Sequence, residues 1–444
     1  MNQRLIKSYF SCIPVLLKEY LSYISKNTIE YIQIIFLLSM IYSLLSFHLI
    51  AFIIFLILYC AFPLTIKEKP TNLASDFDTP MQKKISESLE KNMKEYSLPM
   101  WMSSGIMQTM ISGALKFKTP ILEFDRQLVD SPDGGYFAID WSKNQDHLSE
   151  NSPVIVILHG LAGGCREPYI QRFVYYAMEE GFRCCVITNR GCAGMKMRTP
   201  KAYNSAFFDD AIQSLTIIHE KYPNAPINLI GFSLGANTCL GLSSRKTELL
   251  KELNVTCSVG ISPSPWLISM MLSLCPALDE TFSQFELRLV KKNVEVFQQA
   301  YDRGDFYQDM KLIYCCKSMK QFDDAFTSKN FDYGQKQLYY FDIEQVYHFM
   351  KNSIIPTFTL NAMDDPVAIM TQGLSRRFRN MASVSPFYVP LVSQTGGHLS
   401  WTFKPGHKGY YDDLVLGFMK QMNEMFVSGE LEKLQNEYLE KMKK

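Results

Sequence analysis

Short apolar runs alternate with longer stretches of helical spacing between residues 153 and 393, and this alternation constrains the fold more than any other feature. The helical stretches include EPYIQRFVYYAMEEG and FFDDAIQSLTIIHEKY, and the apolar runs are PVIVILHG, RCCVITNRG, INLIGFS, CSVGISPS, IIPTFTLNA and FYVPLVS. Continuous apolar strands that alternate with helices are typical of a parallel sheet buried on both sides. We therefore expect an α/β fold with a mostly parallel central sheet and helices on both faces.

Two segments depart from this alternation. FDRQLVDSPDGGYFAIDW reads as two extended segments joined by a hairpin turn at Pro132–Gly135, where the residue types suit positive φ. From about residue 264 to 352 the sequence becomes helical, aromatic and rich in methionine. This second segment predicts a helical cap insertion.

Charge and cysteine content exclude several function classes. The 45 Lys and Arg residues balance 44 Asp and Glu residues, and no basic run is present, so nucleic acid is not an expected partner. Eleven cysteines are scattered without a C-x-x-C motif, which indicates neither a disulfide framework nor a zinc site. We expect no metal and no organic cofactor.

Residues 31–66 contain no Asp, Glu, Lys or Arg. This length exceeds the ~20 apolar residues that cross a bilayer, so the segment predicts an N-terminal transmembrane anchor, either one tilted span or a tight hairpin. The orientation stays open, because equal numbers of basic residues flank the segment: Arg4, Lys7, Lys18 and Lys26 before it, and Lys67, Lys69, Lys83 and Lys84 after it.

These features divide the chain into four expected parts. An amphipathic segment and the anchor occupy residues 1–66, with the span within 31–66, and a polar linker follows over 67–96. The α/β domain occupies 97–430, and residues 431–444 form a charged C-terminal helix with a solvated face.

Residues Gly231–Gly235 read Gly-Phe-Ser-Leu-Gly and fit the G-x-S-x-G pattern of a sharp strand-to-helix turn that exposes its serine. An apolar strand, Ile227–Ile230, enters the turn, and ANTCLGLSS leaves it as a helix. Glycines are needed where the chain and the helix come close. Ser233 is therefore the candidate nucleophile, and it requires a base and an acid that orients the base.

Three histidines follow Ser233, and enzymes with this turn have their partners in the order serine, acid, histidine. His348 lies at the end of the predicted insertion, before any suitable acid, and His407 lies in a polar loop. His398 follows the last apolar run, after two glycines that let the chain bend toward the sheet. We predict His398 as the base.

The acid is expected at the end of the preceding strand, where TFTLNAMDDPVA offers Asp364 and Asp365. The usual setting has an apolar residue two positions after the acid, and Asp365 with Val367 fits it better than Asp364 does. We predict Asp365, with Asp364 as the alternative.

A tetrahedral intermediate also needs backbone N–H donors for its oxygen. One donor is expected from Leu234, directly after the nucleophile, and the other from the loop after an early strand. HGLAGG supplies that loop, so Leu161 is predicted as the second donor of an oxyanion hole, and His159 as a structural residue of the turn.

Together these blocks resemble the AB hydrolase 4 family of the α/β-hydrolase superfamily, which includes YheT-like esterases and membrane-anchored phospholipases and acylglycerol lipases. Besides the serine turn, the similar blocks are HGLAGG, TNRGCAG, QFDDAFT, QLYYFD, NAMDDPVA and TGGHLSW, within residues 99–427. The resemblance implies an α/β-hydrolase fold, the triad Ser233, Asp365 and His398, and an N-terminal membrane anchor. His398-Leu-Ser400 departs from the His-Leu-Gly or His-Ile-Gly of relatives, which could alter the acyl pocket.

We therefore expect a membrane-anchored serine hydrolase that cleaves carboxylic ester bonds of lipids, phospholipid or acylglycerol, through an acyl-enzyme. Its partners would be a lipid ester and the bilayer, in an endomembrane such as the endoplasmic reticulum. Two alternatives stay open. The same triad could pass an acyl group from acyl-CoA to an alcohol, or the fold could serve as a non-catalytic lipid or sterol receptor.

Overall fold

A computed structural model of the chain describes residues 53, 65–77, 79–99, 104–114, 121–306, 308–401 and 408–443. The chain divides into two units, one of residues Met1–Ile66 and Ser97–Ser104, the other of Lys67–Tyr96 and Gly105–Lys444. Strands β1 (Thr65–Glu68) and β3 (Tyr96–Pro99) form a two-stranded sheet. The second unit contains a large sheet, its helices and every candidate site residue described below.

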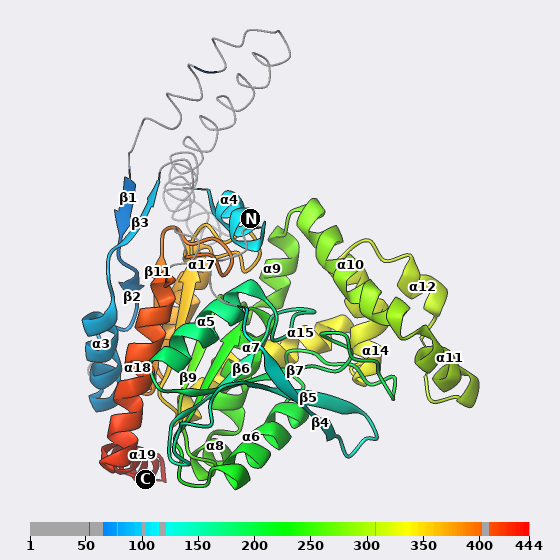
Figure 1. The fold of residues 1–444 in the computed structure, drawn as a ribbon. Coiled ribbons are helices and arrows are strands. Elements are labelled where there is room, and N and C mark those ends of the chain that lie inside the picture. Colours follow the sequence, from blue (N-terminus) through cyan, green and yellow to red (C-terminus); the bar gives the residue numbers. More distant parts are fainter. Residues whose placement is uncertain are drawn as a thin grey trace. The chain divides into compact units, whose positions relative to one another are not determined.

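The large sheet has nine strands among the described residues, and six neighbouring strands run parallel (Figure 1). Every residue of these six strands is buried, which explains why the sequence shows continuous apolar runs. The antiparallel strands β2, β5 and β4 lie at the two edges. In spatial order the strands are β2 (Thr71–Asn72), β11 (Tyr388–Ser393), β10 (Thr357–Ala362), β9 (Val255–Ile261), β8 (Ile227–Phe232), β6 (Val154–Leu158), β7 (Arg183–Thr188), β5 (Tyr136–Ser142) and β4 (Phe124–Asp130). The expected mostly parallel α/β sheet is confirmed.

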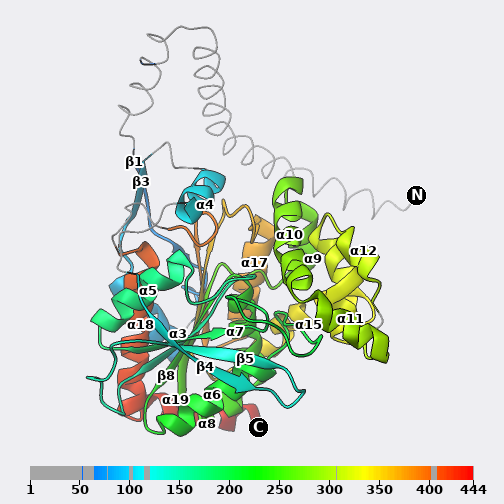
Figure 2. The same ribbon diagram turned by 45° about the vertical axis from the view of Figure 1, so that its right-hand side comes forward.

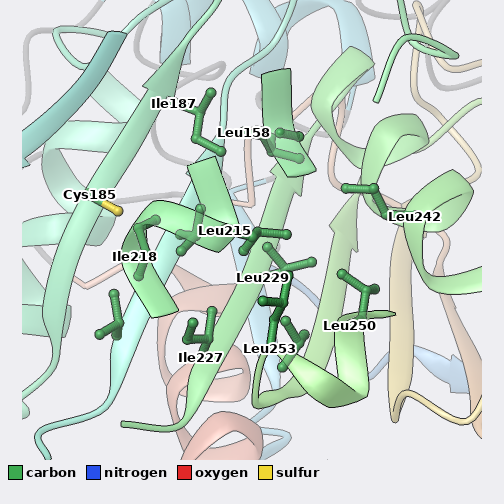
Figure 3. Close-up of a cluster of buried hydrophobic side chains, with 14 of the residues drawn as sticks. Leu158, Cys185, Ile187, Leu215, Ile218, Ile227, Leu229, Leu242, Leu250 and Leu253 are labelled. Carbon is green, nitrogen blue, oxygen red and sulfur yellow. The ribbon is translucent and has the colours of Figure 1, made fainter. Parts of the chain in front are cut away.

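Helices cover both faces of this sheet (Figures 1 and 2). On one face Phe232 of β8 contacts the rings of Phe173 and Tyr411. On the other face Leu229 of the same strand packs with Leu215 and Leu242 in a buried cluster (Figure 3). The first face carries α3 (Pro80–Asn92), α5 (Pro168–Glu179) and α18 (Tyr410–Val427), and the second carries α6 (Asp209–Lys221), α7 (Leu234–Arg245) and α8 (Thr247–Glu252). A further helix, α17 (Gln372–Ser383), packs on β11.

The predicted hairpin is confirmed as strands β4 and β5. They pair antiparallel over their full length, from Phe124 opposite Ser142 to Asp130 opposite Tyr136. Ser131 and Gly135 close the turn, where the Ser131 oxygen accepts from Gly134 N–H and the Gly135 oxygen accepts from Ser131 N–H.

A helical insert, residues 267–352, joins β9 to β10, which are neighbours in the sheet. It occupies the segment for which the sequence predicts a helical insertion over 264–352. Its helices are α9 (Leu267–Ser273), α10 (Pro276–Lys292), α11 (Val294–Arg303), α12 (Met310–Tyr314), α13 (Met319–Phe322), η2 (Asp323–Thr327), α14 (Ser328–Asn330), α15 (Lys336–Glu344), α16 (Val346–Phe349) and η3 (Met350–Asn352).

The sequence predicts a polar linker over residues 67–96, but the structure shows a strand and a helix there that pack on the large sheet. Strand β2 pairs with β11 at the sheet edge, and helix α3 packs against α18. Met81, Ile85 and Leu89 are the buried apolar residues of α3, spaced four apart on one face. This segment therefore belongs to the packed body of the second unit.

The two ends of the chain were predicted as an anchor and a charged helix. Of the span expected within 31–66, only Ile53, Thr65 and Ile66 are described, so that prediction lies outside the described residues. No helix in the described part of the chain is long and apolar enough to cross a bilayer. The charged C-terminal segment is α19 (Glu430–Lys443), and its Gln435 is buried, donating to the Ile354 oxygen at 3.0 Å.

Candidate active site

Ser233 lies in the turn between β8 and α7, with φ 54° and ψ −113°. Such a conformation is strained for a residue other than glycine, and strained residues cluster at functional sites. Both flanking glycines are required by space. A Cβ on Gly231 would lie 2.1 Å from the Gly235 oxygen, and one on Gly235 would lie 2.3 Å from the Leu158 oxygen.

A chain of hydrogen bonds runs from Ser233 through His398 to Asp365. The His398 Nε2 lies 2.9 Å from Ser233 Oγ, and its Nδ1 lies 2.9 Å from Asp365 Oδ2. The Asp365 side chain is fully buried, and its Oδ1 also accepts from the backbone N–H groups of Val367 and Ala368 at 2.8 Å each. Because Nδ1 donates to this fixed carboxylate, Nε2 is left to accept the serine proton.

Asp364, the alternative acid, faces another group. Its Oδ1 accepts from Gly397 N–H at 2.9 Å, and its Oδ2 accepts from Gln108 Nε2 at 3.2 Å. The structure therefore places Asp365, and not Asp364, against the His398 ring.

The other histidines lie away from the serine or outside the described residues. His348 is exposed on α16, next to the Tyr347 ring, and His407 is outside the described residues. His159 is buried, and its Nδ1 donates to Gly160 O at 2.6 Å while its Nε2 accepts from Asn189 N–H at 3.1 Å. Burial lowers the pKa of His159 to about 4, so a neutral ring fixes the turn.

The loop after β6 presents one backbone N–H to the site. The Gly160 N–H donates to the Tyr169 hydroxyl at 3.1 Å, and the Ala162 N–H donates to the Tyr203 hydroxyl at 2.9 Å. Between them, the Leu161 N–H has no acceptor among the described residues, nor has the Leu234 N–H at the start of α7. Both groups are thus available to an oxygen atom placed near Ser233.

Two tyrosines hold this loop, and sequence reasoning missed both. Tyr169 is the second residue of α5, and Tyr203 precedes α6. Their hydroxyl groups act through contacts with a loop elsewhere in the sequence, so no local pattern indicates their role.

Ser233, Leu161 and Leu234 line a pocket whose opposite wall is the helical insert. This wall is mostly apolar, formed by Leu267, Met270, Met271, Leu274, Phe282, Met319, Phe322, Phe326 and Tyr339. It suits a hydrocarbon chain attached to the group that reacts with the serine.

Two carboxyl groups also line the pocket. Burial, together with the charge of Asp323, raises the pKa of Glu286 to about 8. Burial likewise raises the pKa of Asp323 to about 6, although the Tyr340 hydroxyl donates to it at 2.8 Å. Both carboxyl groups therefore keep their protons up to a higher pH than an exposed carboxyl group does, because an apolar surrounding disfavours the charged form.

Helix α4 (Gly105–Ala114) contacts the His398 loop. The Thr109 Oγ1 accepts from the backbone N–H of His398 at 2.8 Å, and Gln108 binds Asp364 as described above. Sequence reasoning missed this helix, although its small and polar residues recur at positions 105, 108, 109 and 112, on one helical face.

Within the described residues no cluster of His, Cys, Asp or Glu could hold a metal ion. The chemistry that these residues allow is nucleophilic attack on an acyl group. A serine bound to an imidazole, a carboxylate behind it and two N–H donors are the parts that such attack requires.

Comparison with known proteins gives matches over the region that contains Ser233, Asp365 and His398. The sequence model of the alpha/beta hydrolase fold matches residues 153–399, more than half of the chain. Phospholipase ABHD3 of Homo sapiens is 27% identical over 350 residues, covering 74% of this chain and 79% of that protein. Monoacylglycerol lipase of Saccharomyces cerevisiae is 26% identical over 272 residues, covering 60% of this chain and 59% of that protein.

A bacterial protein and a solved structure are also similar. The putative esterase YheT of Escherichia coli is 26% identical over 261 residues, covering 59% of this chain and 74% of that protein. The esterase Pf2001 of Pyrococcus furiosus has a TM-score of 0.39 and 15% identity, covering 63% of this chain and 84% of that chain.

Proposed function

Because this chain belongs to the alpha/beta hydrolase fold family, we propose that it is a serine hydrolase that cleaves carboxylic esters of lipids. Its relatives are named phospholipase, monoacylglycerol lipase and putative esterase, and it is an ester hydrolase of this type. The observation that carries the proposal is the hydrogen-bonded series Ser233, His398 and Asp365 at the edge of an apolar pocket.

In the proposed mechanism His398 Nε2 accepts the proton of Ser233 as Oγ attacks the ester carbonyl carbon. The N–H groups of Leu161 and Leu234 bind the oxygen that becomes negative, and Asp365 stabilises the protonated imidazole. The intermediate collapses, and the proton passes from His398 to the departing alcohol. Water, deprotonated by the same nitrogen, then releases the acid from the acyl-enzyme and restores the serine.

The lipid character of the substrate is supported by the pocket and by the N-terminal sequence. The pocket wall offered by the helical insert is mostly apolar, and residues 31–66 contain no Asp, Glu, Lys or Arg. We propose that this segment anchors the protein in a membrane, in an endomembrane such as the endoplasmic reticulum. The anchored full chain should stay in the pellet after extraction with alkaline carbonate, whereas release into the supernatant would contradict an anchor.

Labelling with a fluorophosphonate, which reacts with activated serines, tests the proposed triad in the detergent-solubilised full chain. We expect wild type to label, and Ser233→Ala and His398→Ala to lose labelling. The matched control His348→Ala replaces an exposed histidine and should label like wild type. A folded wild type that does not react would contradict the proposal and favour the non-catalytic receptor.

The acid is tested by paired variants at adjacent positions. Asp365→Asn should lower kcat for a soluble ester by on the order of 10³ to 10⁴, because the imidazole loses its orienting charge. Asp364→Asn keeps a group that can accept from Gly397 and should cost far less. Equal losses in the two variants would contradict the assignment of Asp365.

A further inference from the structure

Helix α4 is amphipathic in the opposite sense to an ordinary surface helix. Ile106, Met107 and Met110 are exposed, and Met110 shows 65% of its surface. Gln108 is buried, although it is polar. A surface helix normally turns its apolar stripe to the core and its polar residues to water, so the outward face of α4 requires an explanation.

The inward face of α4 is fixed by the active-site loop. Thr109 Oγ1 accepts from His398 N–H at 2.8 Å and donates to the Gly105 oxygen at 2.7 Å. A Cβ on Gly105 would lie 1.8 Å from the backbone oxygen of Asp364. The helix therefore cannot turn its apolar residues inward without losing the contacts to the loop that carries His398.

Helix α9 of the helical insert also exposes apolar residues, although its inward face is apolar too. Its Leu267 and Met271 line the pocket, while Ile268 and Leu272, four residues apart, are exposed, Leu272 by 73%. Neither α4 nor α9 contains a charged residue. Figures 1 and 2 show both helices at the same end of the large sheet.

We propose that the exposed face of α4, together with that of α9, docks on a lipid surface. We call these exposed residues the apolar rim, and they are Ile106, Met107 and Met110 of α4 with Ile268 and Leu272 of α9. Exposed apolar patches of this kind mark contact sites for proteins or membranes. The uncharged segment of the same chain ends at Ile66 and is long enough to cross a bilayer, which favours lipid as the occupant.

A second copy of the chain fits the apolar rim less well. Stable protein interfaces bury about 800 Å² on each partner and involve about 20 to 30 residues a side, far more than these five side chains. A lipid surface needs no complementary shape, and it accepts isolated Ile, Leu and Met side chains.

The docking would fix where the reaction occurs. A helix is roughly 10 Å thick, so α4 would hold the His398 loop about one helix diameter from the lipid. This last step rests on the proposed function, whereas the docking itself does not.

Photo-crosslinking tests the occupant directly. The photoreactive residue p-benzoyl-phenylalanine is placed at position 110 of the full chain, which is reconstituted in phosphatidylcholine vesicles and irradiated. The matched control carries it at position 128, where Leu128 is 53% exposed on β4 at the edge of the sheet. We expect lipid adducts several-fold more often at position 110. A crosslink to another segment of the chain, a crosslinked dimer, or equal adducts at both positions would overturn the proposal.

A kinetic comparison provides a second, independent measurement. Met110→Gln should lower the ratio of turnover on an ester in vesicles to turnover on a soluble ester roughly tenfold, because a polar side chain enters lipid less readily. Leu128→Gln should leave this ratio at the wild-type value, and an equal fall in both variants would contradict the proposal. Failure of the proposed function would instead appear as loss of fluorophosphonate labelling, and the crosslinking result does not depend on labelling.

Discussion

Glu286 is a single residue whose protonation links the pocket to stability. Its pKa is raised to about 8 by burial and by Asp323, from 4.5 in an ordinary surrounding. Between these values the folded protein holds a proton that the unfolded chain has lost, so the free energy of unfolding falls as pH rises through this window. The stabilising effect of the neutral group is complete below pH 4.5 and is lost toward pH 8.

Glu286→Gln replaces the carboxyl group with a neutral group of the same shape. We expect wild type to lose more unfolding free energy than this variant between pH 6 and pH 8, by on the order of 1 kcal/mol. Urea unfolding of the detergent-solubilised protein at both pH values measures the difference. The control Glu295→Gln removes an exposed carboxyl group of the same insert and should behave like wild type. An identical fall in Glu286→Gln and wild type would contradict the expectation.

For single residues, the sequence predicts a role where that role depends on neighbouring residues in the chain. The position of Ser233 follows from two glycines whose Cβ atoms would collide with nearby backbone. The sequence alone favours Asp365 over Asp364 only by the apolar residue that follows it, because both follow the same strand, and the fold shows which one faces His398. The roles of Tyr203 and Thr109 depend on partners distant in the sequence, which a local pattern does not identify.

The loop between β6 and α5 is an element whose shape depends on hydroxyl groups outside it. Ala162 has φ 53°, and its N–H donates to the Tyr203 hydroxyl at 2.9 Å. This bond orients the peptide unit next to Leu161, whose N–H is the proposed oxyanion donor. Losing such a donor costs on the order of 10² to 10³ in kcat in other enzymes.

Tyr203→Phe removes the acceptor but leaves the ring. We expect kcat for a soluble ester to fall by roughly ten- to a hundredfold with KM little changed, because the loop is loosened and not removed. The control Tyr388→Phe deletes another buried hydroxyl, bonded to Thr359 at 2.7 Å within the sheet. It should lower stability by about 1 kcal/mol and leave kcat unchanged. Equal kcat values for Tyr203→Phe and wild type would show that the hydroxyl does not position the loop.

Elements before the sheet were predicted less well than those within it. The apolar residues of α3 form a narrow stripe in an otherwise polar sequence, so composition alone indicated a linker. Helix α4 has its polar face inward, which is contrary to the pattern on which helix prediction relies. The buried parallel strands, in contrast, are continuous apolar runs that need no knowledge of their neighbours.

At the scale of the whole molecule, a buried ion pair connects two helices that are far apart in the sequence. Arg172 of α5 donates from Nε to Asp412 Oδ2 of α18 at 2.8 Å, and both side chains are fully buried. The guanidinium also lies over the ring of Tyr411, 4.8 Å from its centroid. Removing one partner of such a pair leaves an uncompensated buried charge.

We expect Arg172→Met to lower the free energy of unfolding by about 3–5 kcal/mol, and the double variant with Asp412→Leu to recover much of that loss. Chemical denaturation of the detergent-solubilised protein measures both. The exposed pair of Arg303 and Asp305 is the control, and Arg303→Met should cost about 0–1 kcal/mol. A cost for Arg172→Met no larger than that of the control would contradict a structural role for the buried pair.

The helical insert also affects how this protein can change over evolutionary time. It occupies the connection between β9 and β10, two neighbouring parallel strands paired from Ser258 and Thr357 to Ile261 and Leu360. Residues gained or lost within the insert leave this register intact. The wall of the pocket can therefore diverge among descendants while the ends of β8, β10 and β11 keep Ser233, Asp365 and His398 in place. Under the proposed function, the chemistry of the serine and the preference for a substrate are thus separable traits, carried by different stretches of one gene.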